Sequence, residues 1–130
     1  STPPQPGAQS LPSDWRDSLP KRLDELGEAW RDDDAWTGMT AAGGVDLPGE
    51  MGGLVALNEL MIHGWDLALS TSQAFDPHGG AVAAVHGYRV ETRKGEVPEG
   101  RFGPQVEVRE DAPLLERAVG LAGRDPAWTP

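Results

Sequence analysis

The first hydrophobic pattern along the chain predicts an amphipathic helix over residues 18–31. Its apolar face is spaced at three and four residues and consists of Leu19, Leu23, Leu26 and Trp30. Ser18 is expected to cap the helix, with Pro20 tolerated in the first turn. Because proline breaks a helix interior, Trp15 is expected on a separate, shorter turn. Three aspartates, residues 32–34, should stop the helix, since negative charge opposes the dipole at a helix C-terminus.

The strongest hydrophobic pattern predicts a second helix over residues 50–71. Its apolar residues lie nearly all round the helix: Leu54, Val55, Leu57, Met61, Ile62, Trp65, Ala68 and Leu69. A helix of this kind belongs at the centre of a domain and not at its periphery. Residues 35–48, which precede it, are predicted to form a hairpin or a wide loop. Gly43 and Gly44 favour a chain reversal there, and Pro48 closes the segment.

The C-terminal part of the chain is predicted to contain two shorter helices, over residues 81–90 and 114–121. Residues 93–104 are rich in Gly and Pro and indicate a loop. Val106 and Val108 alternate with charged residues, which is typical of a short edge strand. The fold class predicted from these patterns is mainly α, with a small irregular α/β tail at the C-terminus.

Composition and length fit one small domain. The chain has 130 residues, of which 38% are hydrophobic, and it contains 17 Gly and 12 Pro. These values predict a modest core with long connections, partly compensated by the large apolar area of five Trp. Residues 1–10 lack apolar periodicity and are predicted to be a disordered lead-in. Residues 11–130 are predicted to form the folded domain.

The charge of the chain argues against nucleic acid as a partner. The formal net charge is −10, with 21 acidic and 11 basic residues, so the average surface repels a polyanion. No run of about 18 apolar residues is present, so no membrane span is expected. The chain contains no Cys, which excludes disulfides and thiolate ligands of its own. A cytoplasmic location is the expectation that follows.

The candidate chemistry lies in the predicted central helix. Glu59 and His63 are one turn apart on one helix face, and Asp66 falls near the same line. A carboxylate buried in such apolar surroundings needs a partner or a cation. An imidazole and a carboxylate at this spacing can bind a divalent metal, and they suit zinc, nickel or iron better than calcium. Asp66 is expected either to orient the His63 ring or to cap a neighbouring backbone group.

A simpler interpretation of Glu59 and His63 is a hydrogen-bonded pair on a helix surface. Two ligands do not complete a zinc site, which normally uses at least three protein ligands. The other histidines are His78, in a Pro- and Gly-rich turn, and His86, on the third predicted helix. Both are interpreted as solvated or packing residues. No catalytic residue can be assigned from the pattern.

The run over residues 58–68 resembles the metal-binding helix of the mycothiol-dependent maleylpyruvate isomerase-like group in the DinB superfamily. Further similar stretches are residues 11–16, 36–50, 102–104 and 121–128. The resemblance implies a four-helix bundle that holds a divalent metal, often zinc or nickel, with Glu59 and His63 as ligands. It also implies a low-molecular-weight thiol as cofactor, because a cation lowers the pKa of a bound thiol and makes it a better nucleophile.

The chain departs from this family pattern at one point. The remaining His ligand of the family comes from an earlier helix, and that segment and the first bundle helix are absent here. The chain is therefore interpreted as the C-terminal part of an incomplete DinB-like bundle. The apolar faces of residues 18–31 and 50–71 would then be exposed, so a second copy or another chain is expected to cover them.

Two functions remain open at this stage. The first is a metal-dependent thiol transferase or isomerase that uses Glu59 and His63 as ligands, with Asn58, Trp65 and Asp66 nearby. The second is a non-enzymatic helical interaction or oligomerisation module that keeps the scaffold and has lost the metal site.

Overall fold

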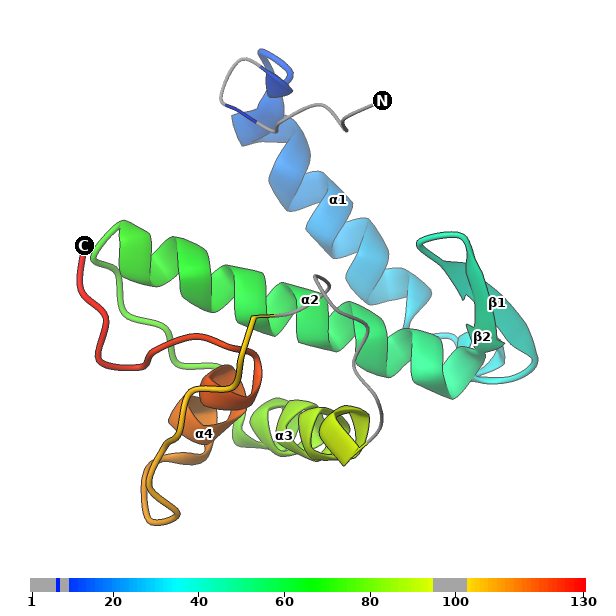
Figure 1. Ribbon diagram of the computed structural model, residues 1–130. Helices are drawn as coiled ribbons and strands as arrows, with labels where there is room; N and C mark the ends of the chain where they lie inside the picture. Colours follow the sequence, from blue (N-terminus) through cyan, green and yellow to red (C-terminus); the bar gives the residue numbers. More distant parts are fainter. Residues whose placement is uncertain (1–6, 8–9, 95–102) are drawn as a thin grey trace, which may run out of the picture.

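The structure is a computed structural model, and it describes residues 7, 10–94 and 103–130. Within these residues the chain forms four α-helices, one short 3-10 helix and a two-stranded antiparallel sheet (Figure 1). The predicted, mainly α fold class is thus confirmed. In chain order the elements are α1 Trp15–Ala29, η2 Asp33–Trp36, β1 Met39–Ala42, β2 Val45–Pro48, α2 Gly49–Ser70, α3 Gly79–Lys94 and α4 Leu114–Leu121.

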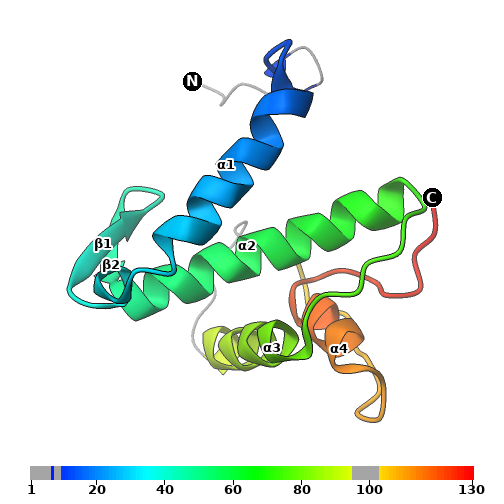
Figure 2. The same cartoon turned by 180° about the vertical axis from the view of Figure 1, so that it is seen from behind.

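Helix α2 is the central element, as its apolar sequence predicts. In both views α1 lies above α2 at an angle, with its C-terminal end near the N-terminal half of α2 (Figures 1 and 2). The helices α3 and α4 lie below α2, and the hairpin sits at the N-terminal end of α2. The helix packs against α3, β1, β2 and η2. This 22-residue helix therefore joins the hairpin and η2 to α3, on which α4 packs.

Helix α1 begins earlier than predicted. Trp15 is its first residue, and Pro20 lies inside the helix, so the expected break between them is wrong. Proline removes one backbone hydrogen bond, but the loss falls near an exposed helix end where water can replace it. The expected Ser18 cap is also wrong, because Ser18 lies within the first turns, where its backbone N–H donates to the carbonyl of Asp14 at 2.9 Å. No residue of α1 is buried.

The segment between α1 and α2 contains a hairpin, which confirms one of the two predicted alternatives. Met39 pairs with Pro48 and Ala42 with Val45. Gly43 and Gly44 form the turn with φ values of 58° and 78°, a conformation that residues with a side chain rarely adopt. Just before it, the Trp36 indole N–H donates to the Trp30 carbonyl at 2.9 Å, which fixes η2 against the end of α1.

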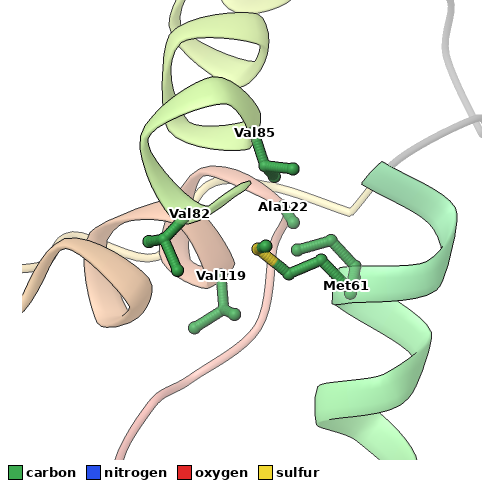
Figure 3. Close-up of a cluster of buried hydrophobic side chains, with 6 residues drawn as sticks. Met61, Val82, Val85, Val119 and Ala122 are labelled. Carbon is green, nitrogen blue, oxygen red and sulfur yellow. The ribbon is translucent and has the colours of Figure 1, made fainter. Parts of the chain in front are cut away.

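The hydrophobic core is formed by α2, α3 and the region of α4. Its buried members are Met61, Ile62, Val82, Val85, Val119 and Ala122. Figure 3 shows Met61 of α2, Val82 and Val85 of α3 and Val119 of α4 close together, with Ala122 just after α4. Since α1 contributes none of them, the core of the described chain lies on the side of α2 that faces away from α1.

The C-terminal segment differs from its prediction in one respect. Val106 and Val108 were expected in an edge strand, but residues 103–113 contain no strand. The segment lies instead against α4, where the backbone N–H of Val106 donates to the carbonyl of Gly120 at 3.0 Å. The alternation of Val106 and Val108 with charged residues therefore reflects packing of one side of the segment on a helix. The predicted irregular tail is confirmed, but the predicted strand within it is wrong.

The remaining boundaries are close to those predicted. Helix α4 has the predicted bounds, whereas α3 is longer than residues 81–90 at both ends. Residues 93 and 94, predicted as loop, belong to α3, and residues 95–102 lie outside the described residues. The predicted disordered lead-in, residues 1–10, also falls outside them except for Gly7 and Ser10.

Candidate metal-binding half-site

Glu59 and His63 face each other on one side of α2. The Nε2 atom of His63 lies 3.2 Å from Oε2 of Glu59. Two donors that each bind a zinc ion at about 2 Å, at a tetrahedral angle, are themselves about 3.3 Å apart. The observed spacing is therefore close to the one that a shared cation requires.

The two side chains are more exposed than the sequence suggested. The Glu59 side chain is 56% exposed and the His63 side chain 63%. The expectation that α2 buries this carboxylate is wrong for the described chain. The reason is that α3 and α4 pack on the face of α2 that contains Met61 and Ile62, and this leaves Glu59 and His63 on a side that no described element covers.

Asp66 holds the other nitrogen of the His63 ring. Its Oδ2 lies 3.2 Å from Nδ1 of His63, so of the two roles expected for Asp66, the contact with the ring is observed. Asp66 also accepts two hydrogen bonds from Arg124, from Nε at 3.1 Å and from Nη2 at 2.8 Å. A bidentate pair of this type fixes a carboxylate in both position and direction.

The charges around Asp66 favour its ionised form. Partial burial raises the pKa of the Asp66 carboxyl, but the hydrogen bonds and positive charge of Arg124, aided by His63, outweigh this effect. The net pKa is lowered. Conversely, the hydrogen bond to Asp66 raises the pKa of Arg124. Asp66 is thus an ionised carboxylate, placed to accept a hydrogen bond from Nδ1 of the His63 ring.

A second polar contact supports Glu59. Asn58 is 3% exposed, and its Nδ2 donates to Oε1 of Glu59 at 3.3 Å. Its Oδ1 accepts a hydrogen bond of 2.6 Å from Nε of Arg89, which is 4% exposed. Arg89 is thus connected to Glu59 through a buried amide. Burial lowers the pKa of Arg89, and the negative charge of Glu59 opposes part of this shift.

Sequence reasoning missed Arg89 and Arg124. Arg89 follows Val82 by seven residues and Val85 by four, which places it on the buried side of α3, so its position was detectable from helical spacing. Arg124 is 58 residues from its partner Asp66, and no local pattern indicates the pairing. The two remaining histidines lie elsewhere, as expected. His78 accepts a hydrogen bond from the Gly80 backbone at 3.1 Å, and His86 is half-buried on α3.

The donor set fits part of a divalent-metal site. Glu59 and His63 supply two donors of the type that zinc and nickel accept, with Asp66 behind the ring as an orienting carboxylate. Across the described ranges, however, no group of three or more His, Asp or Glu side chains is placed to hold a metal ion. The described residues therefore bring together two potential donors, whereas a zinc site normally uses at least three protein ligands.

A cavity of about 360 Å³ opens beside this half-site. Its lining includes Trp65, Asp66, Ser70, Arg124 and Trp128. The two indoles supply apolar walls, and the ion pair between Asp66 and Arg124 supplies polar groups. A small molecule that enters this cavity would come close to the residues that hold the His63 ring.

Comparison with known proteins places the chain in a family. None of the helices among the described residues is both long and apolar enough to cross a bilayer. Searches of curated proteins and of solved structures found no match. A family model described as the mycothiol maleylpyruvate isomerase N-terminal domain matches residues 1–68, just over half of the chain, and these residues include both Glu59 and His63. The chain therefore belongs to the mycothiol maleylpyruvate isomerase N-terminal domain family.

Proposed function

We propose that Glu59 and His63 bind a divalent metal ion, zinc or nickel, in a domain that acts on a low-molecular-weight thiol. The observation that carries the proposal is the geometry of the pair: Nε2 and Oε2 lie 3.2 Å apart while Asp66 holds Nδ1. A carboxylate on the far nitrogen of a histidine is a common companion of metal-ligating histidines, because it fixes the ring and raises its basicity.

The thiol part of the proposal is supported by the family description, which names mycothiol. A bound cation would lower the pKa of a coordinated thiol and so increase its thiolate fraction at neutral pH. The residues of this chain would hold the cation through Glu59 and His63 and keep the ring in place through Asp66. The cavity lined by Trp65 and Trp128 offers room for a thiol-bearing molecule beside them.

The first test is zinc and nickel titration of the purified chain by calorimetry. We expect binding to weaken at least tenfold in His63→Ala and in Glu59→Gln, since each change removes one of two protein donors. His78→Asn is a matched control, because it removes an exposed imidazole and keeps an acceptor for the Gly80 N–H at the start of α3. Equal affinity in all four proteins, or no binding of either metal by the unaltered chain, would overturn the proposal.

An interaction module is the second candidate function. It is favoured by an almost wholly apolar groove of about 430 Å³ between α1 and α2. The groove is lined by Leu23 and Leu26 on α1, by Trp30 just after α1, and by Leu57 and Leu60 on α2. Elemental analysis separates the two candidates. A chain that stays free of metal after expression in zinc- and nickel-supplemented medium supports the module, whereas near-stoichiometric metal that is lost in His63→Ala supports the metal site.

A further inference from the structure

The ring of His63 is held by a chain of contacts that ends outside the family-matched segment. Asp66 holds the ring, and Arg124 holds Asp66. The family match ends at residue 68, whereas Arg124 follows α4 near the C-terminus. The direction of a residue inside the matched segment therefore depends on a residue that lies far beyond it in the sequence.

Arg124 is itself fixed in place. Its Nη1 donates to the carbonyl of Ala122 at 2.8 Å, in addition to the two hydrogen bonds that reach Asp66. Ala122 is a buried member of the core, so this contact ties the guanidinium to the rigid end of α4. The Arg124 side chain is 28% exposed and that of Asp66 is 33% exposed, whereas the His63 ring is 63% exposed. The buried end of α4 thus holds Arg124, Arg124 holds Asp66, and Asp66 holds the exposed His63 ring.

Without this support, an exposed histidine on a helix would sample several rotamers and ring flips. Only some of them point Nε2 toward Glu59. Asp66 alone is a short side chain with rotamers of its own, and the bidentate guanidinium removes that freedom. We propose that Arg124 is a positioning residue for His63: through Asp66 it keeps Nδ1 occupied and Nε2 directed at Oε2 of Glu59.

The expected effect of Arg124 on metal affinity rests on the proposed function, whereas its effect on the His63 ring does not. The orientation of the ring is a property of the metal-free chain and can be measured separately. Loss of an outer partner of a metal-ligating histidine typically weakens metal affinity by about 10- to 100-fold. We therefore expect Arg124→Gln to weaken zinc binding about tenfold or more.

The chain contains a matched control for this change. Arg109 makes the same kind of two-point contact with Asp111, through Nε at 2.8 Å and through Nη2, on an exposed turn that does not touch the half-site. Arg109→Gln removes one arginine and one ion pair, as Arg124→Gln does, and should leave zinc affinity unchanged. Arg124→Lys keeps the positive charge but cannot make the two-point contact with Asp66. We therefore expect its zinc affinity to lie between those of Arg124→Gln and the unaltered chain.

The test combines zinc calorimetry with NMR of the ¹⁵N-labelled histidine rings at one fixed pH. In the metal-free chain, Arg124→Gln should move the ring ¹⁵N shifts of His63 toward those of an unconstrained histidine, while Arg109→Gln leaves them in place. Helix content and the unfolding midpoint are recorded for each variant. If Arg124→Gln does not fold, Asp66→Asn breaks the same chain of contacts with a nearly isosteric side chain and should shift the ring in the same way.

Unchanged His63 ring shifts in both Arg124→Gln and Asp66→Asn would overturn the inference. So would zinc affinity that remains equal to that of the unaltered chain. If the unaltered chain binds no zinc while its His63 ring shifts still respond to Arg124→Gln, the proposed metal function fails and the positioning role stands. The two ideas can therefore fail independently.

Discussion

At the scale of single residues, buried polar groups in this chain are paired with one another. Asn58 and Arg89 are 3% and 4% exposed, and they share a hydrogen bond of 2.6 Å. Among the described residues no buried side-chain nitrogen or oxygen lacks a partner. Because an unpaired buried polar group costs about 1–3 kcal/mol, this pairing is a condition for a stable fold in so small a core.

His86 provides a test of burial at this scale. Burial, and then the positive charge of Arg117, lower its pKa below the ordinary 6.5. The unfolded chain therefore binds a proton at His86 at a higher pH than the folded chain does. Stability that is present above pH 6.5 should be lost as the pH falls through the lowered pKa of the folded state.

The unaltered chain should lose unfolding free energy as the pH falls from about 7.5 to about 5.5, because the unfolded state takes up a proton at His86 more readily than the folded state. We expect this loss to be smaller in His86→Gln, which lacks the titrating group. Urea unfolding at both pH values measures the effect. The unaltered chain, unfolded at the same two pH values, is the reference. An equal pH dependence in His86→Gln would contradict the prediction.

At the scale of elements, glycine decides how closely the C-terminal segment approaches α4. A Cβ atom at Gly120 would lie 2.5 Å from Cγ2 of Val108 and 2.9 Å from the backbone oxygen of Val106. Both distances are too short for real contacts. The bare backbone of Gly120 therefore lets residues 106–108 lie directly on the helix, in the place where the alternating pattern suggested a strand.

The expected result of Gly120→Ala is a loss of about 1–3 kcal/mol in unfolding free energy, since overpacking of this kind forces backbone to move. Gly87→Ala is the matched control. Gly87 is also inside a helix, but a Cβ there would meet nothing within 4 Å, so alanine should stabilise α3 by up to about 1 kcal/mol. Chemical denaturation of both variants measures the contrast, and a neutral or stabilising Gly120→Ala would show that the segment is not in tight contact.

At the scale of the whole molecule, the chain leaves much apolar surface uncovered on the α1 side of α2. Leu23 is 44% exposed and Leu60 is 45% exposed, and both line the groove between α1 and α2. No residue of α1 is buried. A contiguous apolar surface of this kind commonly marks an interaction site in a soluble domain. The expected cover, a second copy or another chain, stays a prediction.

Light scattering of the purified chain at micromolar concentration measures whether copies associate. We expect a mass above that of the single chain, and we expect Leu23→Lys to reduce it, because a charge in the groove must be desolvated on association. Val45→Lys changes an exposed apolar residue on the hairpin, away from the groove, and serves as the control. A monodisperse monomer in the unaltered chain would count against association of this chain with itself.

The sequence alone determined the helices and the local geometry of the candidate pair. Helical spacing is a property of residues close in the chain, so α2, α4 and the one-turn separation of Glu59 and His63 were predicted correctly. The turn at Gly43 and Gly44 follows from local backbone freedom in the same way. Local rules misplaced the start of α1, because they overestimated the effect of Pro20 near an exposed helix end.

Only the tertiary structure decided which face of α2 is buried and what holds the pair. A helix that is apolar nearly all round can pack on any side, and the packing of α3 and α4 on Met61 and Ile62 left Glu59 and His63 exposed. The contact between Arg124 and Asp66 joins residues that are 58 positions apart. Residues 106–108 pack against helix α4 and not against a strand. Such contacts depend on the path of the whole chain, which spacing along the sequence does not contain.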